Sequence, residues 1–560
     1  MCHDMKGVRR SVVCRFFCIV ALSFATTVPA GAAQAAKSEP AKASKAASRE
    51  PDSKPESKQE KQRREQISKN IQQILSDPLA DRSFWGIQAV SLDTGRVLYE
   101  FNSGKLFTPA SNTKLFTTAA ALALIGPAYQ FRTTVETTGA LDRYGRVNGD
   151  IVLVGRGDPN LSGRVLPYHS ATGGSTSPQW VLEDLADQLV QKGVKFVDGS
   201  VIGDDSFFAF ERYGEGWSQE DAVWEWGAPV SALTFNDNSV LVTLQPGDHP
   251  GDKAFASVTP FSELFQIDNR VVTTPAGTGP ARVALAREPG SNLLSISGSI
   301  PAGDSGLSYS LAINDPAEFA AQIFRAILVR KGIVVYGSSR ARHAAPAGIP
   351  APQAYQTPGG GDASAHAPLP FMVLATHESH PLAEDLTIIN KESLNLHAEI
   401  MLRLLGHEKG SGGSIQSGSG VLKDFLTSAG MAPEEFVFLD GSGLSRQNLV
   451  TPAAVGKLLT YIDHQAWSET FRHTLPVAGV DGTLAVRFRG TPLEGRVFAK
   501  TGMLGHINAL SGYATTLSGQ RIAFSIMANN HNMGSHSAIQ AVDRILSGIV
   551  DDRIPSGRRK

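Results

Sequence analysis

Apolar and polar positions along the chain change their spacing at several points, and each change indicates a different kind of element. Residues 84–92 are strand-like, and a turn at 93–95 connects them to a second strand-like run at 96–100, which predicts a β-hairpin. Ala and Leu dominate residues 115–125, so we expect a helix there. From 133 to about 274, short β-prone runs alternate with Gly, Asp and Asn, and this texture predicts an inserted β-rich domain.

The second half of the chain alternates between helical and strand-like patterns. We expect a helix over 316–331, a strand at 333–336, and mainly helices from 382 to about 463. A pair of strands is predicted at 496–499 and 509–516. With 560 residues, the chain is long enough to form more than one domain.

The first 35 residues have the pattern of a secretory signal peptide. Basic residues precede an uncharged apolar run at 16–25, and small residues in two A-x-A patterns follow at 30–35. The alternative is an uncleaved membrane anchor, but the apolar part is short for a span of about 20 residues. All three cysteines lie in this segment, at Cys2, Cys14 and Cys18, so the exported chain would have no disulfide and no thiol nucleophile. We therefore expect an exported, periplasmic protein.

The overall charge is nearly balanced, with 52 basic and 53 acidic residues and a formal net charge of −1. A protein that binds nucleic acid usually shows a basic patch, so we expect no nucleic-acid partner. Hydrophobic residues make up 42% of the chain, which is enough to bury a sizeable core. Residues 36–66 contain almost no large apolar side chain, and this composition predicts a flexible charged tether before the folded part.

Three short motifs have the residue types and spacing that suit nucleophilic catalysis. Ser111 and Lys114 begin a predicted helix, three residues apart, so both side chains lie on one face. The hydroxyl then lies near helix amides, and a lysine with a lowered pKa can take its proton. Ser393 and Asn395 form an S-x-N motif between helical segments, and Lys500 begins a K-T-G motif in a predicted strand. This ordered set is the active-site signature of penicillin-binding proteins and serine β-lactamases.

On these motifs the chain resembles the D-alanyl-D-alanine carboxypeptidase/endopeptidases of the penicillin-binding protein 4 type, the S13 peptidases. Ser393 lies 282 residues after Ser111, an interval that extra domains fill in this family and that is much shorter in β-lactamases. The runs at 157–159 and 440–446 are similar to the family as well. The resemblance implies an α+β fold, in which a penicillin-binding-protein/serine β-lactamase-like transpeptidase domain, with helices around an antiparallel sheet, carries a large β-rich insert.

The resemblance and the composition together divide the chain into seven segments. We expect a signal peptide at 1–35, a charged tether at 36–66, the first part of the catalytic domain at 67–136, the β-rich insert at 137–340, a Gly/Ala/Pro-rich loop at 341–370, the second part of the catalytic domain at 371–553 and a basic tail at 554–560. The cleavage site and the exact limits of the insert stay open.

The family pattern implies a role for each motif residue. Ser111 attacks the carbonyl of the penultimate D-Ala and forms an acyl-enzyme, while Lys114 takes the proton from the hydroxyl. Ser393 passes a proton towards the leaving amine, and Asn395 binds the substrate backbone. Lys500 holds the terminal carboxylate and helps to keep Lys114 neutral through repulsion between like charges.

The rest of the K-T-G strand supplies further implied contacts. The Thr501 hydroxyl meets the terminal carboxylate, and Gly502 lets the strand approach the substrate closely. The backbone amides of Ser111 and Met503 form the oxyanion hole. Met503 replaces the Ser or Thr that usually follows K-T-G, so we expect weakened side-chain contacts but an intact backbone donor.

Residues 216–221, within the insert, are similar to the family segment that reaches the cleft. The acidic residue that faces the free amino group of diaminopimelate falls on Asp221, and the aromatic wall falls on Trp226. The partner of the diaminopimelate carboxylate falls on Arg446, and Arg suits bidentate pairing with a carboxylate. Gly505 replaces a family Gln, which removes one expected hydrogen bond. An acidic surface loop and a structural Arg are the alternative interpretation.

Other functions fit parts of the pattern. A serine β-lactamase would share the acylation step, and a non-catalytic cell-wall-binding protein would share the fold. The long insert argues against the first, and the intact motif residues argue against the second. The H-E-S-H run at 377–380 is one residue short of the H-E-x-x-H zinc motif, so we expect no metal and no other cofactor. We interpret His397 and Glu399, beside the S-x-N motif, as helix surface.

The sequence therefore predicts a serine-type D-Ala-D-Ala carboxypeptidase and D-Ala-diaminopimelate endopeptidase. Its expected partners are the stem peptides of peptidoglycan, with β-lactam antibiotics as covalent inhibitors. The balance between the two activities, the β-lactam affinities and the oligomeric state, a homodimer included, are left open. The basic residues at 558–560 leave peripheral membrane contact open as well.

Overall fold

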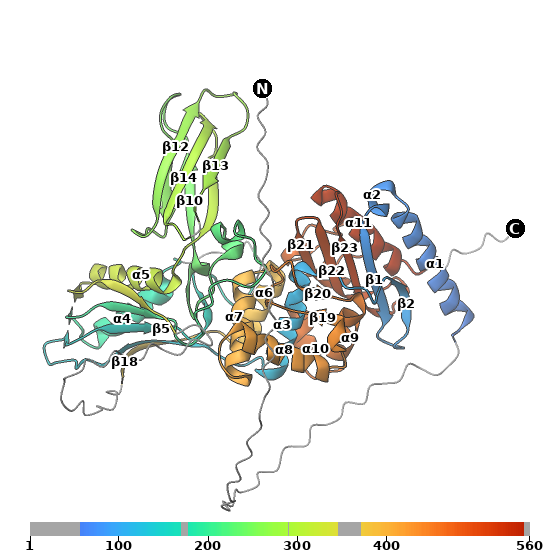
Figure 1. The fold of residues 1–560 in the computed structure, drawn as a ribbon, viewed down its shortest axis with the longest axis horizontal. Coiled ribbons are helices and arrows are strands. Elements are labelled where there is room, and N and C mark those ends of the chain that lie inside the picture. Colours follow the sequence, from blue (N-terminus) through green and yellow to red (C-terminus); the bar gives the residue numbers. More distant parts are fainter. Residues whose placement is uncertain (1–55, 170–176, 289, 345–370, 554–560) are drawn as a thin grey trace, which may run out of the picture. The chain divides into compact units, whose positions relative to one another are not determined.

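The structure is a computed structural model that describes residues 56–169, 177–288, 290–344 and 371–553 (Figure 1). The predicted signal peptide, the tether up to residue 55, nearly all of the 341–370 loop and the basic tail lie outside the described residues. Helices and mainly antiparallel sheets form separate layers, which confirms the α+β class expected from the sequence.

A five-stranded antiparallel sheet joins the early and late parts of the described chain, in the order β2-β1-β23-β22-β21. The predicted hairpin is confirmed as β1 (Phe84–Ser91) and β2 (Val97–Phe101), and β1 pairs with β23 (Arg521–Asn529). The strands β22 (Ile507–Thr515) and β21 (Val497–Leu504) complete the sheet. β21 carries the K-T-G motif and stands at the edge, where no further described strand pairs with it.

Side chains of the central strands alternate between two hydrophobic cores, as a pleated sheet requires. On β22, Leu510 packs in the core that contains α1 (Lys58–Leu75) and α11 (Ser535–Val550). Its neighbour Ala509 packs in the opposite core, which is built from α3 (Thr113–Leu124), α6 (Leu382–Glu392), α7 (Asn395–Lys409), α8 (Ile415–Ser428) and α9 (Pro452–Asp463). Helices therefore cover both faces of the sheet (Figure 1).

Helix α1 begins at Lys58, inside the segment predicted to be a tether, so that part of the prediction is wrong. A capping box explains the start: Ser57 Oγ accepts a hydrogen bond from the Glu60 amide, and the Glu60 carboxylate accepts one from the Ser57 amide. Ile67 and Ile71 are buried in the core shared with α11. Residues 58–66 extend this helix without any buried apolar residue of their own, so their composition alone does not reveal it.

The insert contains a second five-stranded sheet, with the order β17-β8-β5-β3-β18. Its strands are β3 (Arg132–Thr137), β5 (Ile151–Val154), β8 (Val201–Asp204), β17 (Ser339–Arg342) and β18 (Met372–Glu378). β3 pairs with β18, so this sheet begins before the expected limit at 137 and ends beyond the expected limit at 340. Long-range pairing of this kind leaves no local mark in the sequence.

Helices α4 (Trp180–Gln191) and α5 (Pro316–Arg330) share the hydrophobic core of this sheet. α5 confirms the predicted helix, whereas α4 lies in a part of the chain that was expected to be β-rich. The remaining larger strands form two three-stranded sheets, namely β10 (Ser239–Gln245) with β11 (Phe255–Thr259) and β15 (Leu307–Ala312), and β14 (Leu293–Pro301) with β12 (Gln266–Thr274) and β13 (Arg282–Ala286).

A short parallel pair of strands, β6 (Asp158–Leu161) and β9 (Leu233–Phe235), lies where the insert meets helix α7. β6 contacts α7, and the turn η4 (Asn236–Asn238) follows β9 directly. This junction brings residues of the insert close to the S-x-N motif.

None of the helices in the described ranges is both long and apolar enough to cross a membrane. In the same ranges, no three His, Cys, Asp or Glu side chains are grouped so that they could hold a metal ion. His377 of the H-E-S-H run lies on a strand, with its Nε2 3.7 Å from Asp158 Oδ2, whereas the zinc motif needs a helix.

Ile71→Ala tests the packing of α1 against the rest of the protein. Ile71 is fully buried, so its truncation should lower the free energy of unfolding by about 2–5 kcal/mol, the usual range for Ile to Ala in a core. Urea denaturation measures the change. Gln72→Ala, at the neighbouring exposed residue, is the control. Equal stability of Ile71→Ala and wild type would show that α1 does not belong to the folded core.

Candidate active site

Ser111 lies in a short 3₁₀ turn, Ala110–Asn112, that leads directly into α3. Lys114 stands in the first turn of α3, and its Nζ donates a hydrogen bond to Ser111 Oγ at 3.0 Å. Ala110 has a left-handed backbone with φ of 49°, and a Cβ added at Gly443 would lie 1.9 Å from the Ala110 carbonyl oxygen. The turn that carries Ser111 therefore requires a residue without a side chain at position 443.

The Lys114 amine is buried and makes three hydrogen bonds. Besides Ser111 Oγ, it donates to Asn395 Oδ1 at 2.6 Å and to the Ser442 carbonyl at 2.7 Å. Burial lowers the pKa of Lys114 to about 7, and the charges of Asp440 and Glu399 oppose part of this effect. A lysine with such a pKa has a large neutral population near pH 7, so it can accept the proton of a hydroxyl.

The S-x-N motif forms a sharp turn between α6 and α7, and we call residues 393–395 the elbow. Ser393 ends α6 in a left-handed conformation with φ of 64°, and Asn395 is the first residue of α7. Lys500 Nζ donates to Ser393 Oγ at 2.8 Å. Since Asn395 accepts from Lys114, the elbow contacts both lysines of the site and joins all three motifs.

Lys500 is as buried as Lys114. Burial, and then the positive charge of Lys114, hold the pKa of Lys500 well below its usual value. The main cause of the lowered pKa at Lys114 is its own burial, and the expected repulsion between the two lysines appears in the pKa of Lys500. A carboxylate that approached Lys500 would favour the charged form, because an opposite charge raises the pKa of a buried amine.

The Ser442 carbonyl is a contact of Lys114 that the sequence motifs did not reveal, because a backbone acceptor has no residue signature. Glu399 Oε1 accepts hydrogen bonds from the amides of Gly441 and Ser442, both at 2.9 Å. Asp440 accepts further amide hydrogen bonds from the same loop. Two buried carboxylates therefore hold the loop that presents the carbonyl to Lys114.

His397 and Glu399 are both fully buried, so their interpretation as helix surface is wrong. They lie on α7, where every residue from Leu396 to Gly406 is buried. A helix that is covered on all sides has no polar face, and its polar residues then need internal partners. The available sequence signal was the run of apolar residues on every side of these two positions.

The rest of the K-T-G strand lies beside the Ser111 turn. A Cβ added at Gly502 would lie 2.6 Å from the Pro109 carbonyl oxygen, so this glycine permits a close approach of β21 to that turn. Thr501 Oγ1 donates to Thr483 Oγ1 at 2.8 Å, and Met503 is 60% exposed. The strand residues Thr501, Gly502 and Met503 also line a cavity of about 200 Å³.

The three residues expected to determine specificity lie together. Arg446 Nη1 donates to Asp221 Oδ2 at 3.2 Å, and Trp226 Nε1 donates to Asp221 Oδ1 at 3.2 Å. The Trp226 carbonyl accepts a hydrogen bond from Asn395 Nδ2 at 2.8 Å, which connects this group to the elbow. The space around Gly505 is open, because no atom lies within 4 Å of an added Cβ.

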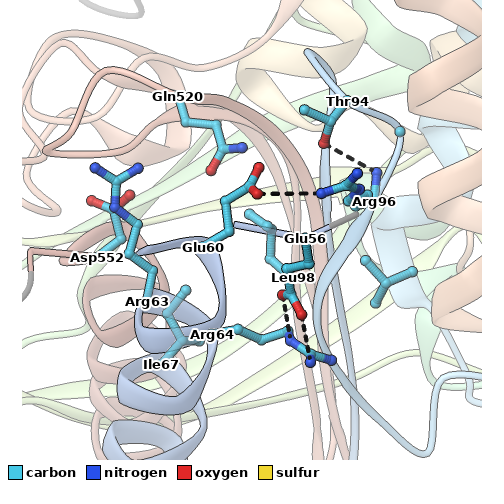
Figure 2. A pocket seen from close by; sticks show the side chains of 12 residues that line it. Glu56, Glu60, Arg63, Arg64, Ile67, Thr94, Arg96, Leu98, Gln520 and Asp552 are labelled. Carbon is cyan, nitrogen blue, oxygen red and sulfur yellow. Dashed lines mark hydrogen bonds and ion pairs between the residues drawn. The ribbon is translucent and has the colours of Figure 1, made fainter. Parts of the chain in front are cut away.

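A larger cavity, of about 450 Å³, is lined by residues outside the three motifs (Figure 2). Helix α1 and the turn between β1 and β2 form much of its wall. Four of its charged side chains form two ion pairs, Arg96 with Glu60 at 3.3 Å and Arg64 with Glu56 at 3.2 Å (Figure 2). The size of a cavity does not by itself indicate chemistry, and no residue of the three motifs lines this one.

The chain is similar to known proteins along most of its length. The family model described as the D-Ala-D-Ala carboxypeptidase 3 (S13) family matches residues 67–348 and 361–548. A D-alanyl-D-alanine carboxypeptidase from Actinomadura sp. (strain R39) is 34% identical over 507 residues, which cover 88% of this chain and 86% of that protein. The D-alanyl-D-alanine carboxypeptidase DacB of Haemophilus influenzae is 26% identical over 463 residues, 82% of this chain and 88% of that protein.

Among solved structures, penicillin-binding protein 4 from Haemophilus influenzae aligns with a TM-score of 0.70 and 25% identity, over 86% of this chain and 98% of that chain. This likeness extends to the insert as well as to the sheet and helices that carry the motifs. The family model matches both motif regions and most of the 282-residue interval between Ser111 and Ser393. The chain therefore belongs to the D-Ala-D-Ala carboxypeptidase 3 (S13) family of peptidases.

Proposed function

We propose that this protein is a serine-type D-Ala-D-Ala carboxypeptidase and D-Ala-diaminopimelate endopeptidase that acts on peptidoglycan stem peptides. The observation that carries the proposal is the 3.0 Å hydrogen bond between Lys114 Nζ and Ser111 Oγ, made by a lysine whose pKa is lowered to about 7 by burial. Membership of the S13 family, and relatives named D-alanyl-D-alanine carboxypeptidases, support the substrate class.

In the first step, Ser111 Oγ forms a bond to the carbonyl carbon of the penultimate D-Ala. Lys114 Nζ accepts the hydroxyl proton, and the carbonyl electron pair moves onto oxygen to give a tetrahedral oxyanion. The backbone amides of Ser111 and Met503 donate to that oxygen, and loss of one such donor typically costs about 2.7–4 kcal/mol.

In the second step, the bond between the carbonyl carbon and the leaving nitrogen breaks. The proton taken by Lys114 reaches that nitrogen through the Ser393 hydroxyl, so the amine leaves neutral and the acyl-enzyme remains on Ser111. A water molecule then attacks the ester carbon, and Lys114 takes its proton. The bond between that carbon and Ser111 Oγ breaks, Oγ receives the proton from Lys114, and the shortened peptide leaves with a free carboxyl group.

Substrate is held by groups on both sides of the reacting carbonyl. Lys500 and the Thr501 hydroxyl bind the terminal carboxylate, and this negative charge offsets the cost of a buried ammonium at Lys500. Asn395 Nδ2 has two N–H groups, of which one donates to the Trp226 carbonyl at 2.8 Å. The other N–H is suited to donate to the substrate backbone.

The endopeptidase part of the proposal rests on Asp221, Trp226 and Arg446. A diaminopimelate side chain ends in an ammonium and a carboxylate, and these charges match Asp221 and Arg446. In the free protein Asp221 and Arg446 pair with each other at 3.2 Å. Binding of the diaminopimelate side chain would replace this ion pair by two, one between Asp221 and the ammonium and one between Arg446 and the carboxylate. The Arg446 side chain is 47% exposed, which leaves it room to turn towards an arriving carboxylate.

We also propose that residues 1–35 direct export to the periplasm, where peptidoglycan lies. β-Lactam antibiotics present a strained amide and a carboxylate in the arrangement that the substrate offers, so Ser111 is their expected attachment point. A structure of Haemophilus influenzae penicillin-binding protein 4 is described as complexed with a β-lactam, which supports this expectation.

Intact-mass measurement after incubation with benzylpenicillin tests the nucleophile. Wild type should gain a single adduct, and Ser111→Ala should gain none, because the variant lacks the oxygen that forms the ester. Ser393→Ala is the matched control: it keeps the pair of Ser111 and Lys114 and should still form the adduct, though more slowly. An adduct on Ser111→Ala would contradict the assignment, and rapid turnover of many penicillin molecules would favour a β-lactamase.

The rate of acylation should depend on pH through Lys114. Only the neutral amine accepts the Ser111 proton, so the rate constant should rise with pH and level off above a midpoint near the Lys114 pKa of about 7. Below the midpoint it should fall about tenfold for each pH unit, as expected for the loss of one general base. Stopped-flow acylation by a chromogenic β-lactam measures the profile. A flat profile would show that another base operates, and a midpoint close to the ordinary lysine value of 10.5 would contradict the lowered pKa of Lys114.

Asp221→Ala separates peptide specificity from the chemistry at Ser111. We expect kcat/KM for diaminopimelate-containing peptides to fall about tenfold or more, which corresponds to the loss of one charged contact of about 1.4 kcal/mol. Acylation by a small β-lactam should stay nearly unchanged, since such a ligand would not extend to Asp221. Glu220→Ala, an exposed acidic neighbour, is the control.

Mass analysis of the products of defined muropeptides measures peptide hydrolysis, which is then compared with the rate of β-lactam acylation. If peptide hydrolysis and β-lactam acylation fall together in Asp221→Ala, the residue is structural. If neither changes, the insert does not supply this contact.

A further inference from the structure

Two residues of the insert form a bidentate ion pair at its junction with the catalytic helices. Arg164, in the loop after β6, donates from Nη1 to Asp237 Oδ1 at 2.8 Å and from Nη2 to Asp237 Oδ2 at 2.5 Å. Asp237 lies in the turn η4. Both side chains are only partly exposed, 22% for Arg164 and 29% for Asp237. A paired fork of this kind fixes the relative orientation of its two partners.

This pair contacts the catalytic domain on both sides of the elbow. Arg164 Nε lies 3.9 Å from Glu392 Oε2, and Glu392 is the residue before Ser393. Asp237 Oδ1 lies 3.0 Å from His397 Nε2, and His397 is two residues after Asn395. The insert therefore touches α6 where it ends and α7 where it begins.

His397 is suited to act as a fixed link between Asp237 and α7. Its side chain is fully buried, and burial lowers its pKa, so the ring is neutral near pH 7. A carboxylate can only accept, so His397 Nε2 carries the proton and donates to Asp237. The other ring nitrogen, Nδ1, is buried and has no hydrogen-bond partner among the described residues, which agrees with a tautomer in which Nδ1 carries no proton to donate.

Both segments joined by these contacts have unusual backbone conformations. Asn236, Asp237 and Asn238 have φ of 50°, 52° and 52°, and Ser393 has φ of 64°. Left-handed conformations are uncommon for residues other than glycine, and a run of three persists only where the surroundings impose it. Internal hydrogen bonds hold the insert turn, including one from Asn238 Nδ2 to the Pro229 carbonyl at 2.8 Å.

From this geometry we propose that Arg164 and Asp237 are positioning residues that hold the elbow in its reactive geometry, so that acylation of Ser111 depends on the insert. The elbow carries Ser393, which contacts Lys500, and Asn395, which contacts Lys114. A small rotation of α6 against α7 would move both groups away from the lysines at once. Displacements of about 1 Å in such groups can reduce a rate about a hundredfold.

This inference rests on the proposed acylation of Ser111 and adds a role for the insert besides peptide specificity. The Arg164–Asp237 pair differs from Asp221, which is expected to touch the peptide. The positioning pair should therefore affect the reaction of small ligands as well as that of peptides.

Stopped-flow acylation of the full-length Asp237→Asn variant by a chromogenic β-lactam tests the proposal. Asn keeps the size and tolerates the left-handed backbone, but it cannot accept both hydrogen bonds from Arg164. We expect the first-order acylation constant to fall about tenfold or more, while the non-covalent dissociation constant changes less than about twofold. The final amount of bound β-lactam per protein should equal that of wild type.

A second variant and a matched control guard against a general loss of stability. Arg164→Lys keeps the positive charge but not the fork, and it should slow acylation to a smaller extent. Glu136→Gln removes a comparable ion pair with Arg156, made at 2.8 Å inside the insert, and should leave acylation unchanged. If Arg164 and Asp237 only stabilised the fold, their variants would bind less β-lactam per protein or unfold at a lower temperature. The folded fraction would still be acylated with the rate constant of wild type.

Two results separate a failure of this inference from a failure of the proposed function. If wild type itself is not acylated, the proposed function is wrong. If wild type is acylated and both Asp237→Asn and Arg164→Lys react at its rate, the pair does not position the elbow. An equal loss of rate in Glu136→Gln would also overturn the inference, because it would show that any damage to the insert slows the reaction.

Discussion

The proposed chemistry depends on keeping the Lys114 amine away from water, with three oxygen atoms within hydrogen-bond distance of its Nζ. Three separate parts of the chain supply those oxygen atoms: the turn before α3, the elbow, and the loop at 440–446. An ammonium in such a place is costly, and the cost appears as a pKa near 7 in place of 10.5. In the proposed mechanism, the same burial that destabilises the charged lysine makes it a base at neutral pH, so packing and reactivity would have one origin.

Much of the candidate site could be predicted from the sequence because its groups are side chains at fixed short spacings. Ser111 and Lys114 stand one helical turn apart, so their contact follows from local geometry alone. The Ser442 carbonyl and its support by Glu399 could not be predicted, because a backbone acceptor can belong to any residue type. The size of the Lys114 pKa change could not be predicted for a related reason: its depth of burial depends on how distant segments pack.

The fold shows the same division between local and distant information. The hairpin of β1 and β2 and the helix α5 follow from patterns within about 20 residues, and the structure confirms them. The pairing of β3 with β18 joins segments that are far apart in the chain, so the sequence left the exact limits of the insert open. Helix α1 was partly missed because its first turns are polar and only its later turns are buried.

The protonation of Lys114 can be observed directly by nuclear magnetic resonance on protein labelled with ¹³C at the lysine side chains, followed as the pH is raised. The signal that disappears in Lys114→Arg belongs to this residue, and the signal that disappears in Lys500→Arg serves as the internal comparison. The Lys114 signal should titrate with a midpoint of about 7. A midpoint near the ordinary lysine value of 10.5 would contradict the claim that burial turns Lys114 into the base that activates Ser111.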